Sequence, residues 1–201
     1  MIALLTSKQS TVWTAIEAAE LKPILPVAVI GIGGLGQLAI QFLKALGHMV
    51  IAIDNRREGL DLADKVPSKL RPDLIVDYND EDATKKVLDG AGNGGVQAVI
   101  VCTDSVAATK WSLKILRHRG VCVALGLPTD GFHFDAFDLM FKELSVKGSL
   151  VANKKLLDDM MRVVAAHDVK SLIHTVDLGD APRLPEMYVQ ADLQGRLVVK
   201  M

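Results

Sequence analysis

The stretch Val27-Ala28-Val29-Ile30-Gly31-Ile32-Gly33-Gly34-Leu35-Gly36 decides the fold. Its apolar start is typical of a buried strand, and its glycines have the spacing G-x-G-x-x-G. Gly31 permits a tight turn, Gly33 lets the backbone approach a pyrophosphate, and Gly36 lets the next helix pack close to the strand. The start of that helix offers free N–H groups and a partial positive charge to an anion. The loop residues predicted to contact a dinucleotide are Gly31, Gly33, Gly34, Leu35 and Gly36.

A second apolar run, Met49–Asp54, ends in an acid eighteen residues after Gly36. At this distance from the glycine loop, a carboxylate is placed to accept hydrogen bonds from the adenosine ribose of a dinucleotide. Strand, glycines, helix, strand and acid stand in the order that the motif requires. The sequence therefore predicts a dinucleotide site.

Composition narrows the class of protein. The 201 residues are 50% hydrophobic and 4% aromatic, which suits one domain with an aliphatic core. A net charge of −1 argues against nucleic acid as a partner. No apolar run reaches the roughly 18 residues that span a bilayer, and the N-terminus lacks the pattern of a signal peptide. We therefore expect a cytoplasmic protein with no membrane partner, whose Cys102 and Cys122 are buried thiols rather than a disulfide or a metal site.

Strand-like runs alternate with helical patterns along the chain. This alternation predicts an α/β fold with a doubly wound, mostly parallel sheet, the Rossmann fold, in a single domain over residues 1–201. Residues 1–22 form an N-terminal helix region, with its helix over Thr11–Leu21, and residues 172–201 form a strand–helix–strand tail. Between them, the predicted strands after the first two are Asp73–Tyr78, Val96–Thr103, Gly120–Leu127 and Leu144–Val151. The predicted helices after the glycine loop include Arg56–Lys65, Asp80–Asp89, Ala107–Arg117 and Lys154–His167.

From Thr11 to the C-terminus the chain resembles the coenzyme-binding domain of the zinc-type, medium-chain alcohol dehydrogenases. The segments that carry the resemblance are Val27–Gly36, Ile51–Asp54, Val99–Thr103, Gly120–Pro128, Val146–Val151 and Gly195–Val199. In that family a catalytic domain precedes this one and supplies the zinc. This chain has no His-Glu dipeptide and no Cys-x-x-Cys pair, so the expected protein has no catalytic zinc of its own. The resemblance fits either a naturally short protein or a fragment truncated to the coenzyme domain.

The resemblance also implies roles for residues at the ends of the strands. Asp54 would hold the adenosine ribose and favour NAD over NADP, because a carboxylate repels a 2′-phosphate, while Arg56 and Arg57 partly offset that repulsion. The alternative for Asp54 is a solvated strand-end acid followed by a helix N-cap at Asn55. The further residues expected beside the coenzyme are Asn55, Arg56, Cys102, Thr103, Leu125, Gly126, Ser149 and Leu150.

Catalytic residues are harder to assign. The polar candidates near the expected crevice are Thr103, Asp104, His133 and Ser149, with His174 as a further histidine. The alternative for Thr103 and Asp104 is turn and N-cap chemistry, and the alternative for the histidines is an ordinary surface or core role.

Four of the five phenylalanines fall within residues 132–141, with Met140 beside them. In the resembled family this region contributes to subunit contact, which predicts a homodimer through Phe132–Phe141. The alternative is local packing of a short helix onto the sheet.

Three hypotheses about function follow. The first is an NAD(H)-binding oxidoreductase that acts on a small molecule. Hydride transfer needs a closed site and a group that polarises the substrate carbonyl, so a partner chain or a larger parent protein would have to supply the catalytic lobe. The second is a reused scaffold that acts as an isomerase or cyclase on an apolar small molecule. The third is a non-catalytic module for cofactor binding or dimerisation. We favour the first, because the glycine loop and the acid occur together.

Overall fold

Six parallel strands form the central sheet of the computed structural model, which describes residues 3–92, 94–188 and 195–200. Their order is β3-β2-β1-β4-β5-β6, so successive strands are added first on one side of β1 and then on the other. The strands are β1 Val27–Ile30, β2 Val50–Asp54, β3 Leu74–Asp77, β4 Val96–Val101, β5 Leu116–Ala124 and β6 Ser145–Gly148.

The central strands are buried on both faces because helices cover both sides of the sheet. Val29 of β1 lies in register between Ala52 of β2 and Ile100 of β4, and all three side chains are fully buried. Continuous aliphatic runs such as Val27–Ile30 are what a parallel sheet of this kind requires. The predicted doubly wound Rossmann fold is confirmed.

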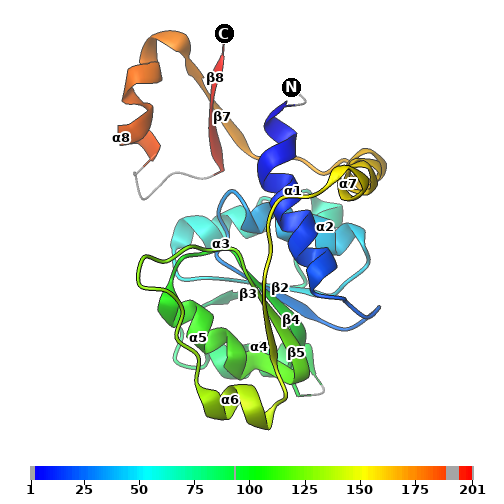
Figure 1. Ribbon diagram of the computed structural model, residues 1–201. Coiled ribbons are helices and arrows are strands. Elements are labelled where there is room, and N and C mark those ends of the chain that lie inside the picture. The colour runs from blue at the N-terminus through cyan, green and yellow to red at the C-terminus, as the bar shows by residue number, and fades with distance from the viewer. Residues whose placement is uncertain (1–2, 93, 189–194, 201) are drawn as a thin grey trace.

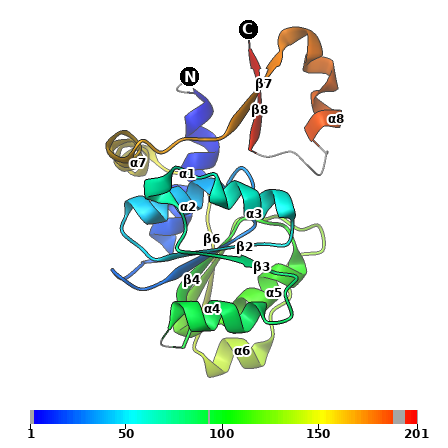
Figure 2. The same cartoon turned by 180° about the vertical axis from the view of Figure 1, so that it is seen from behind.

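Two layers of helices enclose the sheet, as Figures 1 and 2 show from opposite sides. One layer packs on the face that carries Val29 and Ala52, and the other packs on the face that carries Ala28 and Ile51. The first layer holds α1 Ala3–Ala18, α2 Gly36–Ala45, α3 Arg57–Asp64, the 3-10 helix η1 Ser68–Leu70 and α7 Lys154–His167. The second holds α4 Ala83–Ala91 and α5 Val106–Ile115, with α6 Ala136–Phe141 beside them.

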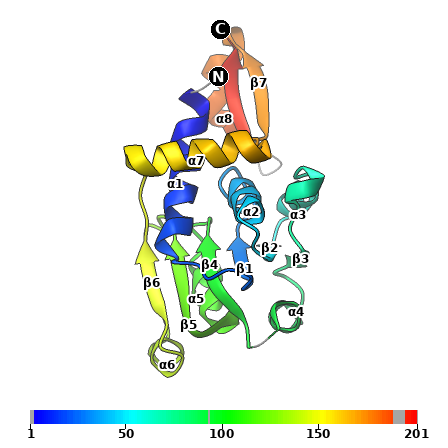
Figure 3. The same ribbon diagram turned by 90° about the vertical axis from the view of Figure 1, so that its right-hand side faces the viewer.

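The tail forms a separate small unit. β7 Ile173–Asp177 and β8 Arg196–Lys200 pair in parallel as a two-stranded sheet, and η2 Leu178–Arg183 and α8 Leu184–Tyr188 follow β7. Figure 3 shows this unit above the main sheet, at the end toward which β6 points. Among the described tail residues only Val176 is buried.

Several boundaries differ from the prediction; β5, for example, spans Leu116–Ala124 rather than Gly120–Leu127. The first helix runs over Ala3–Ala18 rather than Thr11–Leu21. Residues 4–10 contain no proline or glycine that would stop a helix, and the chain leaves the helix before Glu20, which has a positive φ of 51°. The strand predicted over Leu144–Val151 spans only Ser145–Gly148, and the three residues that follow have no regular secondary structure.

The turn between β1 and α2 should make Gly36 intolerant of any side chain. A Cβ at Gly36 would collide with the carbonyl oxygen of Gly31, so we expect Gly36→Ala to lower the free energy of unfolding by about 1–3 kcal/mol. This loss should appear even though alanine is the better helix former. Gly148→Ala is the matched control, since a Cβ there meets nothing within 4 Å in the described chain. Urea unfolding measures both, and equal stabilities of the two variants would contradict the packing.

Candidate functional site

A cavity of about 510 Å³ opens at the carboxyl ends of β1 to β4. In an open α/β sheet this edge, where the strand order reverses beside β1, is the usual place for a ligand. We refer to it as the first cavity. Its lining consists of Ile30, Gly31, Gly33, Asp54, Asn55, Arg56, Tyr78, Cys102, Thr103, Asp104, Ser105 and Ala108.

The glycine loop combines one tightly packed position with one open position. Gly31 has φ +87°, and a Cβ there would lie 2.9 Å from the Cβ of Thr103, so the loop approaches β4 only because this residue is glycine. At Gly33, in contrast, the only described atom that a Cβ would meet is Nη2 of Arg56, at 4.0 Å. Gly33 therefore presents bare backbone to the cavity, beside the start of α2. Gly34, Leu35 and Gly36 complete the turn into that helix.

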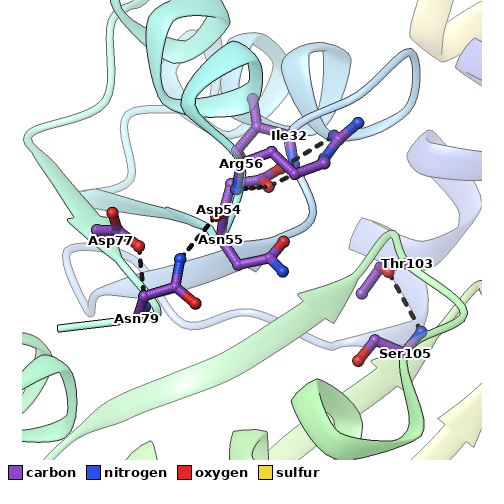
Figure 4. A network of polar contacts seen from close by, with 8 residues as sticks. All are labelled: Ile32, Asp54, Asn55, Arg56, Asp77, Asn79, Thr103 and Ser105. Carbon is purple, nitrogen blue, oxygen red and sulfur yellow. Dashed lines mark hydrogen bonds and ion pairs between the residues drawn. The ribbon is translucent and has the colours of Figure 1, made fainter. Parts of the chain in front are cut away.

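The carboxylate of Asp54 ties two loops together at the base of the cavity (Figure 4). Its Oδ2 accepts a hydrogen bond of 2.6 Å from the backbone N–H of Ile32, and its Oδ1 accepts one of 2.9 Å from the N–H of Arg56. Asp54 is only 3% exposed. The interpretation of Asp54 as a solvated acid is therefore wrong, and the N-cap of α3 is Arg56 rather than Asn55.

Tyr78 forms part of the cavity wall and was not predicted from the sequence. It follows directly after β3, and its ring packs edge-on against Trp111, with centroids 5.1 Å apart. Next to it, the side-chain amide of Asn79 donates to the carbonyl oxygen of Asn55 at 2.7 Å and so fixes the loop after β2. In the sequence, Tyr78 could have been recognised as a wall residue by its position at the carboxyl end of a predicted strand.

The loop after β4 supplies three of the predicted residues: Cys102, Thr103 and Asp104. The hydroxyl oxygen of Thr103 accepts from the backbone N–H of Ser105 at 3.2 Å, and Ser105 caps α5 by accepting from the N–H of Ala108. The turn and N-cap interpretation thus describes Thr103 and Ser105 well. Asp104 is exposed at the cavity rim.

A second cavity of about 610 Å³ lies at the ends of β5 and β6, and its lining is mostly apolar. Gly126 of its lining lies directly against Thr103 of the first cavity, because a Cβ at Gly126 would collide with the carbonyl oxygen of Thr103. Two apolar side chains at its rim are strongly exposed: Leu127 at 93% and Leu150 at 79%. Its lining consists of Thr11, Ala124, Leu125, Gly126, Leu127, Phe132 and residues 146–151, which include Ser149.

The catalytic candidates are not brought together. Thr103 and Asp104 line the first cavity, and Ser149 lines the second. His133 is exposed in the loop before α6 and lines neither cavity, and His174 is exposed on β7. Within residues 3–92, 94–188 and 195–200 no three His, Cys, Asp or Glu side chains are placed to hold a metal ion.

Both cysteines are free; Cys122 is buried as predicted, whereas Cys102, which lines the first cavity, is only partly buried. Burial raises the pKa of the Cys102 thiol to about 12. Burial also raises the pKa of Cys122, although a hydrogen bond with the Ser112 hydroxyl partly opposes that shift. Because the thiolate is the reactive form, neither side chain is suited to act as a nucleophile at neutral pH.

In the part of the chain that the structure describes, no helix has the length and apolar character needed to cross a membrane.

Comparisons with known proteins agree on one family. Residues 34–166 match the family model described as zinc-binding dehydrogenase. An alcohol dehydrogenase of Geobacillus stearothermophilus is 32% identical over 191 residues, which are 95% of this chain and 55% of that enzyme. The chain thus spans about half the length of the curated relatives that it matches.

Two solved structures show the same fold with a coenzyme bound. The structure of acetophenone reductase from Geotrichum candidum NBRC 4597, in complex with NAD, superposes on this chain with a TM-score of 0.83 at 23% identity. The superposition covers 99% of this chain and 55% of the reductase chain. A structure from Sinorhizobium meliloti 1021, described as a zinc-binding dehydrogenase bound to NADP, has a TM-score of 0.83 at 22% identity. That superposition covers 96% of this chain and 58% of the dehydrogenase chain. Proteins of this fold thus hold NAD in one case and NADP in the other.

The raised thiol pKa values predict the behaviour of the cysteines. Native protein at pH 8 should react slowly with iodoacetamide at both thiols, and unfolded protein should react at once. As pH rises above about 8.5, the unfolded thiols ionise while the folded ones stay protonated, so folding stability should fall from there toward pH 12. Alkylation followed by mass spectrometry measures the first effect. Rapid native labelling of Cys122 at pH 7 would show that its thiol is not buried as described.

Proposed function

The chain belongs to the zinc-binding dehydrogenase family, where it corresponds to the coenzyme-binding domain, and from this premise we propose that it binds NAD(H) in the first cavity as part of an alcohol dehydrogenase-type oxidoreductase. The observation that carries the proposal is the pairing of an open backbone at Gly33 with the carboxylate of Asp54 in one cavity. The pyrophosphate would lie over Gly33 at the start of α2, and the adenosine ribose would lie against Asp54.

We propose NAD(H) rather than NADP(H) as the preferred coenzyme. Asp54 is held in place by two backbone N–H groups, so its carboxylate cannot turn away from the ribose without breaking both hydrogen bonds. A carboxylate fixed in this way opposes the negative charge of a 2′-phosphate. The nicotinamide end would extend past Thr103 toward the second cavity, where Leu125, Gly126, Ser149 and Leu150 lie near the strand ends.

The redox reaction itself would need a catalytic lobe in addition to these residues. The coenzyme, when bound, supplies or accepts the hydride, and this domain's part is to position the nicotinamide against a small alcohol or carbonyl substrate. The second cavity is wide open, and the exposed tail side chains Ile173, Leu178 and Tyr188 offer further apolar surface. We propose that a lobe contributed by a partner chain or by another part of a longer protein covers these surfaces and excludes water.

We also propose a homodimer through the exposed face of α6. Phe137, Met140 and Phe141 are 64–72% exposed, and the rings of Phe137 and Phe141 stack with centroids 4.0 Å apart. Phe134, in contrast, packs on the core, so local packing accounts for only part of residues 132–141.

A cytoplasmic location remains our expectation, because free thiols persist in a reducing compartment.

The loop assignment is tested by Gly33→Asp. The position is open, so the variant should fold with an unchanged melting temperature, while its carboxylate should repel the pyrophosphate and weaken NADH binding by about 100-fold or more. Gly33→Ala is the control for bulk without charge and should lose less affinity. NADH fluorescence titration measures all three proteins. Wild-type affinity in a folded Gly33→Asp variant would place the coenzyme elsewhere.

The dimer is tested by the double substitution Phe137→Asp and Phe141→Asp. Charges on the apolar face of α6 should turn a dimer into a monomer in sedimentation velocity. Ile24→Asp is the control, because Ile24 is 86% exposed in the loop before β1, and β4 and β5 separate β1 from β6, the strand that α6 precedes. A wild-type protein that is already monomeric at tens of micromolar would contradict this interface.

A further inference from the structure

A third cavity, of about 180 Å³, lies at the amino ends of β4 and β5, on the edge of the sheet opposite the first cavity. The loop before β1 and the first residues of β5 form its wall. We refer to it as the amino-edge cavity. β4 is six residues long, so about 15–20 Å of strand separates the two cavities. A ligand in the amino-edge cavity and a coenzyme in the first cavity therefore do not compete for space.

A bulge in β5 carries the basic segment Arg117-His118-Arg119 to this cavity. Val96 of β4 pairs with Leu116, but Ala98, only two residues later, pairs with Val121. β5 thus has three more residues than β4 over this stretch. Bulges redirect the side chains of a strand, and this one places all three basic side chains in the lining of the amino-edge cavity.

The buried side chain of Gln97, on β4, fixes the opposite wall. Its Oε1 accepts a hydrogen bond of 2.8 Å from the backbone N–H of Lys22. Its Nε2 donates to the carbonyl oxygens of Lys22 and Leu25, at 3.0 and 2.7 Å. An amide that is bonded at both ends in this way holds the loop before β1 in one conformation. The backbone of Lys22 is therefore fixed at the wall that faces the β5 bulge.

The lining of the amino-edge cavity has a local excess of positive charge. Its cations are Lys22, Arg117 and Arg119, with His118 as a further nitrogen donor. Among the described lining residues the one acid is Glu20, whose Oε1 lies 2.6 Å from Nζ of Lys147 and is neutralised by it. The whole chain has a net charge of −1, so this excess belongs to the cavity and not to the protein in general.

Two of the three cations have no counter-charge. Nε of Arg119 lies 2.7 Å from Oε2 of Glu143. Lys22 and Arg117, in contrast, form no ion pair with any residue that the structure describes. Like charges that converge on one cavity from separate loops repel one another, and an anion between them removes that repulsion.

Backbone strain is also concentrated around this cavity. Of the five non-glycine residues with a positive φ in the described chain, four belong to the surrounding loops. They are Glu20, Ile24, Arg119 and Glu143, with φ between 51° and 72°. Glycine adopts this conformation without steric cost, yet Arg119 carries a charged side chain here. Strain of this kind clusters where a structure holds side chains for a ligand.

We propose that the amino-edge cavity binds a phosphate group, free or carried by a small molecule, between Arg117 and Lys22. The planar guanidinium of an arginine matches two phosphate oxygens at once, and a lysine adds a compact positive charge. The cavity is smaller than the roughly 300–1,000 Å³ of pockets that enclose a drug-sized ligand. It therefore encloses the phosphate, and the rest of a larger ligand extends into solvent.

Calorimetric titration at low ionic strength with inorganic phosphate and with glycerol 3-phosphate tests this inference. Wild type should bind with a millimolar or lower Kd, and Arg117→Gln should weaken binding about ten-fold or more. Lys22→Gln should weaken it about three-fold or more. Neither side chain forms an ion pair in the described chain, so both variants should keep the wild-type melting temperature.

The matched control is Lys155→Gln, which removes the same charge from an exposed position on α7, outside the cavity lining. Its phosphate affinity should stay within about two-fold of wild type. Tighter binding of glycerol 3-phosphate than of phosphate would support a phosphate monoester as the ligand, and equal affinities would support free phosphate. No saturable binding at millimolar phosphate, or equal weakening by Lys155→Gln and Arg117→Gln, would overturn the inference.

The glycine loop is a second place where phosphate could bind, and Gly33→Asp separates the two. This variant should keep the phosphate affinity of the amino-edge cavity, and Arg117→Gln should keep the wild-type NADH affinity. Loss of phosphate binding in Gly33→Asp would place the anion at the glycine loop and overturn the inference. Binding of polyglutamate but not of phosphate would also overturn it, in favour of an acidic protein partner. A wild type that binds phosphate through Arg117 but no NADH would support this inference and contradict only the proposed function.

Discussion

The 2.6 Å hydrogen bond from the backbone N–H of Ile32 to the carboxylate of Asp54 is the contact on which the site depends. A buried carboxylate is tolerated only when donors surround it. Here the donors come from the loops after β1 and β2, and the Ile32 donor is in place only when the glycine loop makes its tight turn. Asp54 therefore stabilises the fold and lines the first cavity at once, which makes the shape of that cavity part of the stability of the domain.

Thr103 is the second point at which separate loops converge. Gly31 and Gly126 approach it closely from the ends of β1 and β5, and neither position has space for a side chain. These approaches bring the first cavity, at β1 to β4, next to the second cavity, at β5 and β6. The arrangement suits an elongated ligand with a polar, charged half and a flatter, more apolar half. A dinucleotide that ends in nicotinamide has this form, which is why the two cavities are interpreted as one binding surface.

Much of this could be predicted from the sequence because the deciding signals are local. The glycine spacing, the acid at the end of β2 and the helix Lys154–His167, which matches α7, all depend on residues near one another in the chain. The place of Tyr78 in the cavity wall and the approach of Arg56 to Gly33 could not be predicted, because each depends on contacts between loops distant in sequence. Asn79 reaches back to Asn55, and Arg56 extends over Gly33. His133 was a candidate for the opposite reason: its residue type suggested chemistry, while its side chain lines neither cavity, although its neighbour Phe132 lines the second.

The central claim is that a nicotinamide dinucleotide lies over Gly33 and against Asp54. The most direct measurement is a titration of isotopically labelled protein with NADH, followed through the backbone amide signals in NMR spectra. We predict saturable shifts for the amides of Gly33, Arg56 and Thr103, with the signals of β7 and β8 unchanged. Absence of any shift at Gly33 and Arg56 when NADH is in excess, or shifts confined to the tail, would contradict the account.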